Sequence, residues 1–188
     1  MKCWALISGL LVLAGTILFA LFKWSILLPI IITAGTVFYH VGIRLLIGCA
    51  FDRFLNNRTD FRKRWYQVAS WEKALYEKLR VKQWKKQMPT YDAALFDPSL
   101  HSWVDIARAM CQAELVHEVN AAVSFFPLFF SACFGVLPVF AITSVLAAGY
   151  DMLFVILQRY NRPRVLHLAA REEQRSGHRE RTFEDEKV

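Results

Sequence analysis

One short stretch places two carboxylates and an imidazole at helical spacing. In AELVHEVN, Glu114, His117 and Glu118 are three and four residues apart, so a helix presents them on one face. We predict that His117 is a general base whose ring is held by Glu114 or Glu118. Solvated charges near a helix end are the plainer alternative. We predict no metal, because no H-x-x-x-H or H-E-x-x-H spacing accompanies the three groups.

A second motif, QRYNRPR at residues 158–164, gathers cations and hydrogen-bonding side chains. Its predicted substrate-binding residues are Arg159, Tyr160, Asn161, Arg162 and Arg164. Guanidinium groups bind phosphate or carboxylate in bidentate fashion. Pro163 is expected to break the helix and to direct two of the arginines to one place. Anchoring of the chain at a membrane exit is the alternative role.

Three further ionisable residues lie inside apolar runs. His40 and Arg44 are four residues apart, and Asp151 lies in a later run. Such groups normally face a bundle interior and mark function. We predict that His40 and Arg44 bind substrate and that Asp151 joins the catalytic group, as orienter of an arginine or as partner of His40. An Arg44–Asp151 ion pair that only neutralises the bundle is an equal alternative.

The elements that position these residues are apolar segments long enough to cross a membrane. The chain has 188 residues, of which 55% are hydrophobic and 21% charged, with a net charge of +7. Uncharged or nearly uncharged runs cover residues 3–22, 26–48, 119–134 and 136–157. A spanning helix needs about 20 residues, so the third run is expected to extend back through residues 114–120 or to enter the membrane only partly. This composition argues against a disordered chain and against a soluble enzyme.

These runs predict an all-α, polytopic membrane protein with four transmembrane helices arranged as two hairpins. One membrane domain is expected over residues 1–188, with hairpins at 1–49 and 113–158, an amphipathic segment at 50–112 and a charged tail at 159–188. Four cysteines without a C-x-x-C pair indicate neither a zinc site nor a disulfide framework. A signal peptide is the competing interpretation of the first run.

The segment between the hairpins is basic and rich in aromatic residues. Residues 51–90 carry eleven Lys and Arg against four Asp and Glu. This mixture suits a membrane headgroup interface, although a solvated basic face that only fixes topology is equally open. Nucleic-acid binding is disfavoured by the flanking membrane runs. Because basic loops remain on the cytoplasmic side, both termini are predicted to be cytoplasmic.

Three segments in order, VKQWKKQMP at 81–89, AELVHE at 113–118 and QRYNRPR at 158–164, resemble the glycosyl-4,4'-diaponeurosporenoate acyltransferase family. The resemblance runs from about residue 76 to residue 171. It implies a small bacterial protein of the cytoplasmic membrane that transfers a fatty acyl group to a hydroxyl of a glycosylated or lipid-linked acceptor, such as a carotenoid glycoside. The expected donor is acyl-CoA or acyl-ACP, and no cofactor is expected to be bound.

Within that interpretation the arginines of QRYNRPR bind donor phosphate or stabilise the oxyanion. Lys82, Lys85 and Lys86 attract the donor, with Trp84 beside them, and membrane lipid is the surrounding partner. Two rivals are an integral-membrane methyltransferase of the isoprenylcysteine carboxyl methyltransferase type, using S-adenosylmethionine, and a non-enzymatic lipid-binding or assembly module. Stabilisation by one donor or the other separates the two enzymes.

Overall fold

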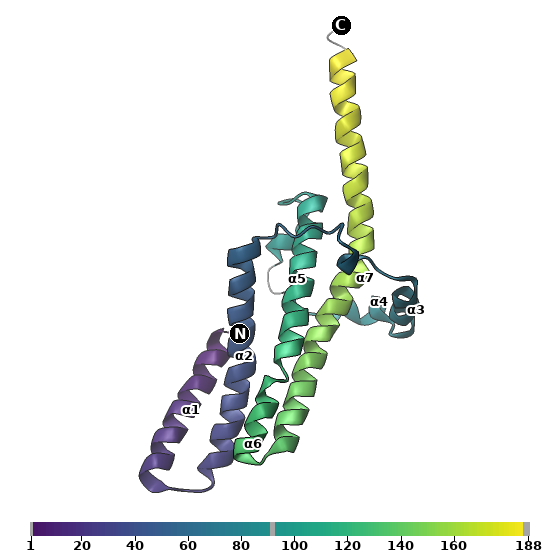
Figure 1. The fold of residues 1–188 in the computed structure, drawn as a ribbon. Coiled ribbons are helices and arrows are strands. Elements are labelled where there is room, and N and C mark those ends of the chain that lie inside the picture. The colour runs from purple at the N-terminus through teal and green to yellow at the C-terminus, as the bar shows by residue number, and fades with distance from the viewer. Residues whose placement is uncertain (1, 91–92, 186–188) are drawn as a thin grey trace. The chain divides into compact units, whose positions relative to one another are not determined.

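The computed structural model describes residues 2–90 and 93–185, with side chains as far as Arg175 (Figure 1). Its four long apolar helices are α1 (Lys2–Phe22), α2 (Leu27–Leu55), α5 (Trp103–Val123) and α7 (Leu137–Asp185). The candidate membrane spans are Lys2–Phe22, Leu27–Leu55, Trp103–Phe134 and Leu137–Arg175. The helices pack as pairs, α1 with α2 and α5 with α7. The predicted all-α, multi-pass membrane fold is confirmed.

The described residues pack into two compact units. Unit 1 comprises Met1–Phe54 and Val116–Met152, and unit 2 comprises Leu55–Leu115 and Leu153–Val188. Helices α5 and α7 therefore contribute residues to both units. The division of one membrane domain into the four predicted segments stays a prediction, and residues 186–188 of the predicted tail lie outside the described residues.

Unit 1 begins with the helical hairpin of α1 and α2, which lie side by side (Figure 1). Lys23 closes α1 in the left-handed conformation, with φ of 55°, and its N–H donates to the carbonyl oxygen of Phe19 at 2.9 Å. Gly15 allows a close approach, because a Cβ there would lie 2.8 Å from Cγ1 of Ile31. Large apolar side chains of α1, such as Leu10 and Leu13, point outward, as expected of a helix that faces lipid.

The third candidate span extends back much further than its apolar run. Helix α5 begins at Trp103 and ends at Val123. It is followed by the 3-10 helix η4 (Phe126–Phe130) and the short α6 (Ser131–Phe134). Gly135, with φ of 69°, then reverses the chain toward α7. The expected extension through residues 114–120 is confirmed, because these residues lie within α5.

In unit 2, the basic segment between the hairpins folds into short helices. They are η1 (Arg64–Tyr66), α3 (Ser70–Lys78), α4 (Val81–Trp84), η2 (Lys85–Gln87) and η3 (Ala94–Phe96). Val81 and Cys111 are fully buried within this unit, and Tyr66 and Tyr76 are nearly so. Trp65 and Trp71 remain exposed, which leaves aromatic rings on the surface of the basic segment.

The expected helix break at Pro163 is wrong, because α7 continues from Leu137 to Asp185 through this residue. A proline removes one backbone hydrogen bond, a loss that helices of membrane proteins tolerate where neighbouring groups hold them. Here Arg162, which precedes the proline, is fully buried, and Ala169, which follows it, is buried. Packing on both sides therefore keeps the helix continuous.

Candidate active site

The polar interior of unit 1 centres on the carboxylate of Asp151, whose side chain is 1% exposed. Its Oδ1 lies 2.9 Å from Nδ1 of His117, and its Oδ2 accepts a hydrogen bond from Arg44. We call these three residues the Asp151 cluster. The carboxylate is thus shared between a guanidinium group from α2 and an imidazole from α5.

Arg44 is satisfied by several acceptors, from α2, from α7 and from the residue that follows α5. Besides Asp151, it donates to the carbonyl oxygens of His40 at 2.6 Å and Ala147 at 3.0 Å, and to Oγ of Ser124 at 3.3 Å. Because a charge at membrane depth requires such partners, Arg44 fixes α2 against α7 and against the chain that follows α5 within this unit. The predicted alternative of an Arg44–Asp151 ion pair is present.

The contact with Asp151 determines which nitrogen of His117 is basic. A carboxylate at Nδ1 favours the tautomer in which Nδ1 carries the hydrogen, and Nε2 then holds the lone pair. The imidazole side chain is 23% exposed, so it is accessible in a way that Asp151 is not. The ring is therefore oriented by Asp151, whereas the sequence favoured Glu114 or Glu118 for this task.

Unit 2 contains a second network, in which Glu114 is completely buried between two arginines. Its Oε1 accepts a hydrogen bond from Nη1 of Arg159 at 2.6 Å, and its Oε2 accepts one from Arg162. Arg159 also binds Glu72, with Nε at 2.6 Å from Oε2 and Nη2 at 2.7 Å from Oε1. We call Glu72, Glu114, Arg159 and Arg162 the arginine–glutamate network. Two carboxylates thus balance two guanidinium groups.

Aromatic and sulfur groups complete this network. The hydroxyl of Tyr76 donates to Oε2 of Glu72 at 2.5 Å, and Nη1 of Arg162 donates to Sγ of Cys111 at 3.2 Å. The guanidinium carbon of Arg162 lies 5.3 Å from the centre of the Tyr66 ring, within cation–π range. These contacts hold the guanidinium group of Arg162 inside the unit.

Hydrogen bonds and burial shift the pKa values of Glu72 and Tyr76, which lie outside the candidate membrane spans. The hydrogen bonds from Arg159 lower the pKa of Glu72 to about 2, and the bonds from Tyr76 and the Ala69 N–H act in the same direction. Burial, followed by the hydrogen bond to Glu72, raises the pKa of Tyr76. Glu72 is therefore ionised and Tyr76 neutral throughout the physiological range.

The predicted phosphate-binding arginines consequently divide into two kinds. Arg159 and Arg162 are engaged by carboxylates, while Arg164 is exposed. Arg164, Lys82 and Lys86 lie close enough to Lys85 to lower its pKa, although burial is the larger cause. We call these four residues the basic cluster. Gathered like charges of this kind attract an anion.

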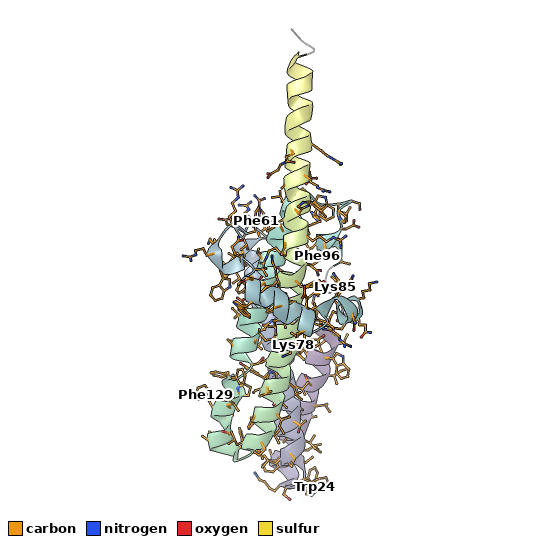
Figure 2. All side chains as sticks on the ribbon, turned by 90° about the vertical axis from the view of Figure 1, so that its right-hand side faces the viewer. Trp24, Phe61, Lys78, Lys85, Phe96 and Phe129 are labelled. Carbon is orange, nitrogen blue, oxygen red and sulfur yellow. The ribbon has the colours of Figure 1, made fainter. Side chains whose placement is uncertain are left out.

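Neighbouring groups hold Lys85 in this cluster, where it lies beside α7 (Figure 2). Its Nζ donates to Oδ1 of Asn161 at 2.8 Å and lies 4.9 Å from the centre of the Tyr160 ring. Trp84, by contrast, donates its Nε1–H to the carbonyl oxygen of Leu79 at 3.1 Å. Two residues of QRYNRPR therefore position a lysine, and the tryptophan supports the local chain.

Sequence reasoning missed Glu72, the second acid that the network requires. It lies in a segment that stands out for its positive charge, and none of the four acids of residues 51–90 was predicted to be a partner of an arginine. The available signal was charge balance, because buried guanidinium groups require carboxylate partners.

The partly buried Glu118 lies on α5, and His40 is buried on α2. Among the described residues, no group of three His, Cys, Asp or Glu side chains is arranged to hold a metal ion.

Fold and site together define a multi-pass membrane protein with a histidine–aspartate pair. The family model described as glycosyl-4,4'-diaponeurosporenoate acyltransferase matches residues 62–171, more than half of the chain. The chain belongs to this family and is an acyltransferase. No curated protein and no solved structure matches it. The match favours the acyltransferase interpretation over the methyltransferase and the binding module.

We predict that Arg162→Ala destabilises the protein strongly. The change leaves Glu114 with one guanidinium partner inside a buried site, and breaking a buried pair in this way costs about 3–5 kcal/mol. Thermal unfolding in detergent is the measurement, with the exposed Arg164→Ala as matched control. Equal melting temperatures for the two variants would contradict the structural role given to Arg162.

We also predict acid sensitivity from Glu72. Its pKa is about 2 in the folded protein against an ordinary value of 4.5, so its ionisation stabilises the fold above pH 4.5. This contribution is lost as the pH falls from 4.5 toward 2. In acid titrations followed by tryptophan fluorescence, Glu72→Gln should be less stable than wild type at neutral pH. The difference should narrow over that window, and a difference independent of pH would contradict the assignment.

Proposed function

We propose that this acyltransferase moves a fatty acyl group from acyl-CoA or acyl-ACP to a hydroxyl of a glycosylated or lipid-linked acceptor, with His117 as general base. The observation that carries the proposal is the 2.9 Å contact between Nδ1 of His117 and the buried carboxylate of Asp151. A histidine paired with an acid in this way is suited to remove a proton from an alcohol.

In the proposed step, Nε2 of His117 takes the proton of the acceptor hydroxyl as its oxygen attacks the thioester carbonyl. A carbon–oxygen bond forms, and the carbon–sulfur bond of the tetrahedral intermediate then breaks. The imidazolium returns its proton to the leaving thiolate. Asp151 stabilises the transient positive charge on His117, and Arg44 holds Asp151 in place. Glu114 and Glu118 have no role in orienting the ring in this scheme.

The donor's phosphate groups are assigned to the basic cluster of Lys82, Lys85, Lys86 and Arg164. Both acyl-CoA and acyl-ACP carry phosphate on the arm that bears the thioester, so the same charges serve either donor. Arg159 and Arg162 support the fold in this scheme, because their guanidinium groups are bound to Glu72 and Glu114. This differs from the first expectation, in which all three arginines of QRYNRPR bound the donor.

The proposed orientation places both termini and the basic segment on the cytoplasmic side of a bacterial membrane. The excess of Lys and Arg in residues 51–90 supports it. Soluble acyl thioesters are made in the cytoplasm, which makes this the side from which the donor arrives.

His117→Ala should lower kcat by at least roughly 100-fold, the usual contribution of a general base, while the protein remains folded. The measurement is transfer of radiolabelled palmitate from palmitoyl-CoA to dodecyl β-glucoside by the purified protein in nanodiscs. His167→Ala, which changes an exposed histidine of α7, is the matched control. Near-normal turnover by His117→Ala would refute the base assignment, and no transfer by the wild type under any donor would refute the proposed reaction.

Lys85→Ala should raise the KM for palmitoyl-CoA by roughly tenfold, the equivalent of one lost charge-assisted hydrogen bond, with little change in kcat. The effect should shrink at high salt, because screening weakens the attraction in the wild type. Lys78→Ala, at an exposed lysine on α3, controls for net charge. If both lysine variants raised KM equally, the basic cluster would have no specific role.

A further inference from the structure

One side of α3 carries large apolar side chains that are exposed. Trp71, Leu75 and Leu79 follow one another at four-residue spacing, and Leu79, which directly follows α3, keeps a right-handed helical conformation. The three therefore lie along one side of the helix, with exposed fractions of 66%, 38% and 43%. We call them the α3 stripe. A contiguous apolar surface of this kind marks a site of interaction.

A different side of α3 is fixed to α7. Glu72 and Tyr76 are buried. Glu72 accepts two hydrogen bonds from Arg159, and the ring of Tyr76 lies 6.1 Å from that of Tyr160. Residues one turn apart on α3 thus contact consecutive residues of α7, so the two helices cross where α3 lies beside α7 (Figure 1). The α3 stripe is therefore held in a defined place within unit 2.

That place is the end of the apolar run of α7. The run covers residues 136–157, and Arg159 and Tyr160 follow it almost at once. About 20 apolar residues cross the hydrocarbon core of a membrane, so Arg159 and Tyr160 lie where hydrocarbon meets headgroups. A short helix that crosses α7 at this level lies along the membrane surface, as interfacial amphipathic helices do.

The residues around the α3 stripe match such an environment. Trp65 is 62% exposed, and its carbonyl oxygen accepts a hydrogen bond from Arg159 at 2.9 Å, so a second exposed tryptophan lies at this level. Tryptophan is enriched at membrane interfaces. Of the five exposed charged side chains in residues 70–82, four are Lys or Arg, and such cations are attracted to anionic headgroups. Depth, aromatic content and charge together favour an anionic lipid surface over a protein partner.

We propose that the α3 stripe and Trp65 dock into the headgroup region of a leaflet that contains anionic phospholipid. The apolar side chains enter the boundary between headgroups and acyl chains, and the surrounding cations contact lipid phosphates. Glu72, on the attached side of α3, joins this docking surface to the arginine–glutamate network. The inference does not depend on the proposed reaction, and a protein that docks in this way without transferring palmitate would refute only that reaction.

Spin labels test the depth of α3 in the bilayer. The full chain, with its three exposed cysteines replaced by alanine and the buried Cys111 retained, is reconstituted in nanodiscs of phosphatidylcholine and phosphatidylglycerol. One variant carries the label at Leu75→Cys. The matched control carries it at Glu77→Cys, which is exposed on another side of α3. Collisions with oxygen, which enters the bilayer, are compared with collisions with a water-soluble nickel chelate.

The ratio of oxygen to nickel accessibility should be higher at residue 75 than at residue 77. Equal ratios would overturn the proposal. A label at residue 75 that neither reagent reaches would also overturn it, because a protein contact would then cover the stripe.

A pair of leucine variants tests whether the stripe causes the docking. With the label at residue 75, Leu79→Gln should lower the ratio toward the value at residue 77. Leu100→Gln, at an exposed leucine elsewhere in unit 2, should leave it unchanged. Both variants should melt at the same temperature in detergent, since Trp84 bonds only the main chain of Leu79. An unchanged ratio in Leu79→Gln, or a lower ratio together with a lower melting temperature, would overturn the proposal.

Lipid composition tests the charge of the docking surface. The ratio at residue 75 should fall in nanodiscs of phosphatidylcholine alone, and it should also fall at high salt in nanodiscs with phosphatidylglycerol, because salt screens the attraction between cations and headgroups. A ratio that is independent of both anionic lipid and salt would overturn the assignment to anionic phospholipid.

Discussion

The structure depends on the pairing of charges that are buried within helices. Glu114 has no exposed surface, and its carboxylate is stabilised only because Arg159 and Arg162 approach it from α7. Arg159 in turn requires Glu72, which brings α3 of the basic segment against α7. An isolated ion at this depth is so costly that each partner fixes the position of the next. The arrangement of unit 2 follows from that chain of requirements.

The same constraint determines which groups remain for chemistry. In unit 1, Asp151 pairs with Arg44 and still contacts His117, and the partly exposed imidazole is the member of the cluster that is left for the proposed chemistry. In unit 2, pairing removes two of the three arginines of QRYNRPR from solvent and leaves the exposed Arg164 beside three lysines, of which Lys85 is partly buried. The partners of a charged residue, and not its residue type, therefore distinguish the candidates for catalysis and anion binding from the charges that support the fold.

The sequence predicted the helices well because their lengths and apolar composition are local properties. It also located Glu114, His117, Asp151 and the arginines, since ionisable residues in apolar runs are conspicuous. Which charged residues pair with each other was harder to predict, because the pairing depends on the rotation of each helix and on segments far apart in the sequence. The i, i+3 spacing of Glu114 and His117 suggested one dyad, whereas the two residues take different partners. Glu72 was hidden in a basic segment, and Pro163 was misjudged because tertiary packing outweighs its local preference.

Residues 62–171, which match the family model, do not include Arg44, the cation that pairs with Asp151. Asp151 and His117 lie within residues 62–171, whereas Arg44 lies before them. Without a guanidinium partner, this carboxylate would be a buried charge without a compensating cation, which is costly. The N-terminal hairpin therefore contributes more than an additional membrane anchor, because Arg44 supplies the cation that pairs with the carboxylate contacting His117.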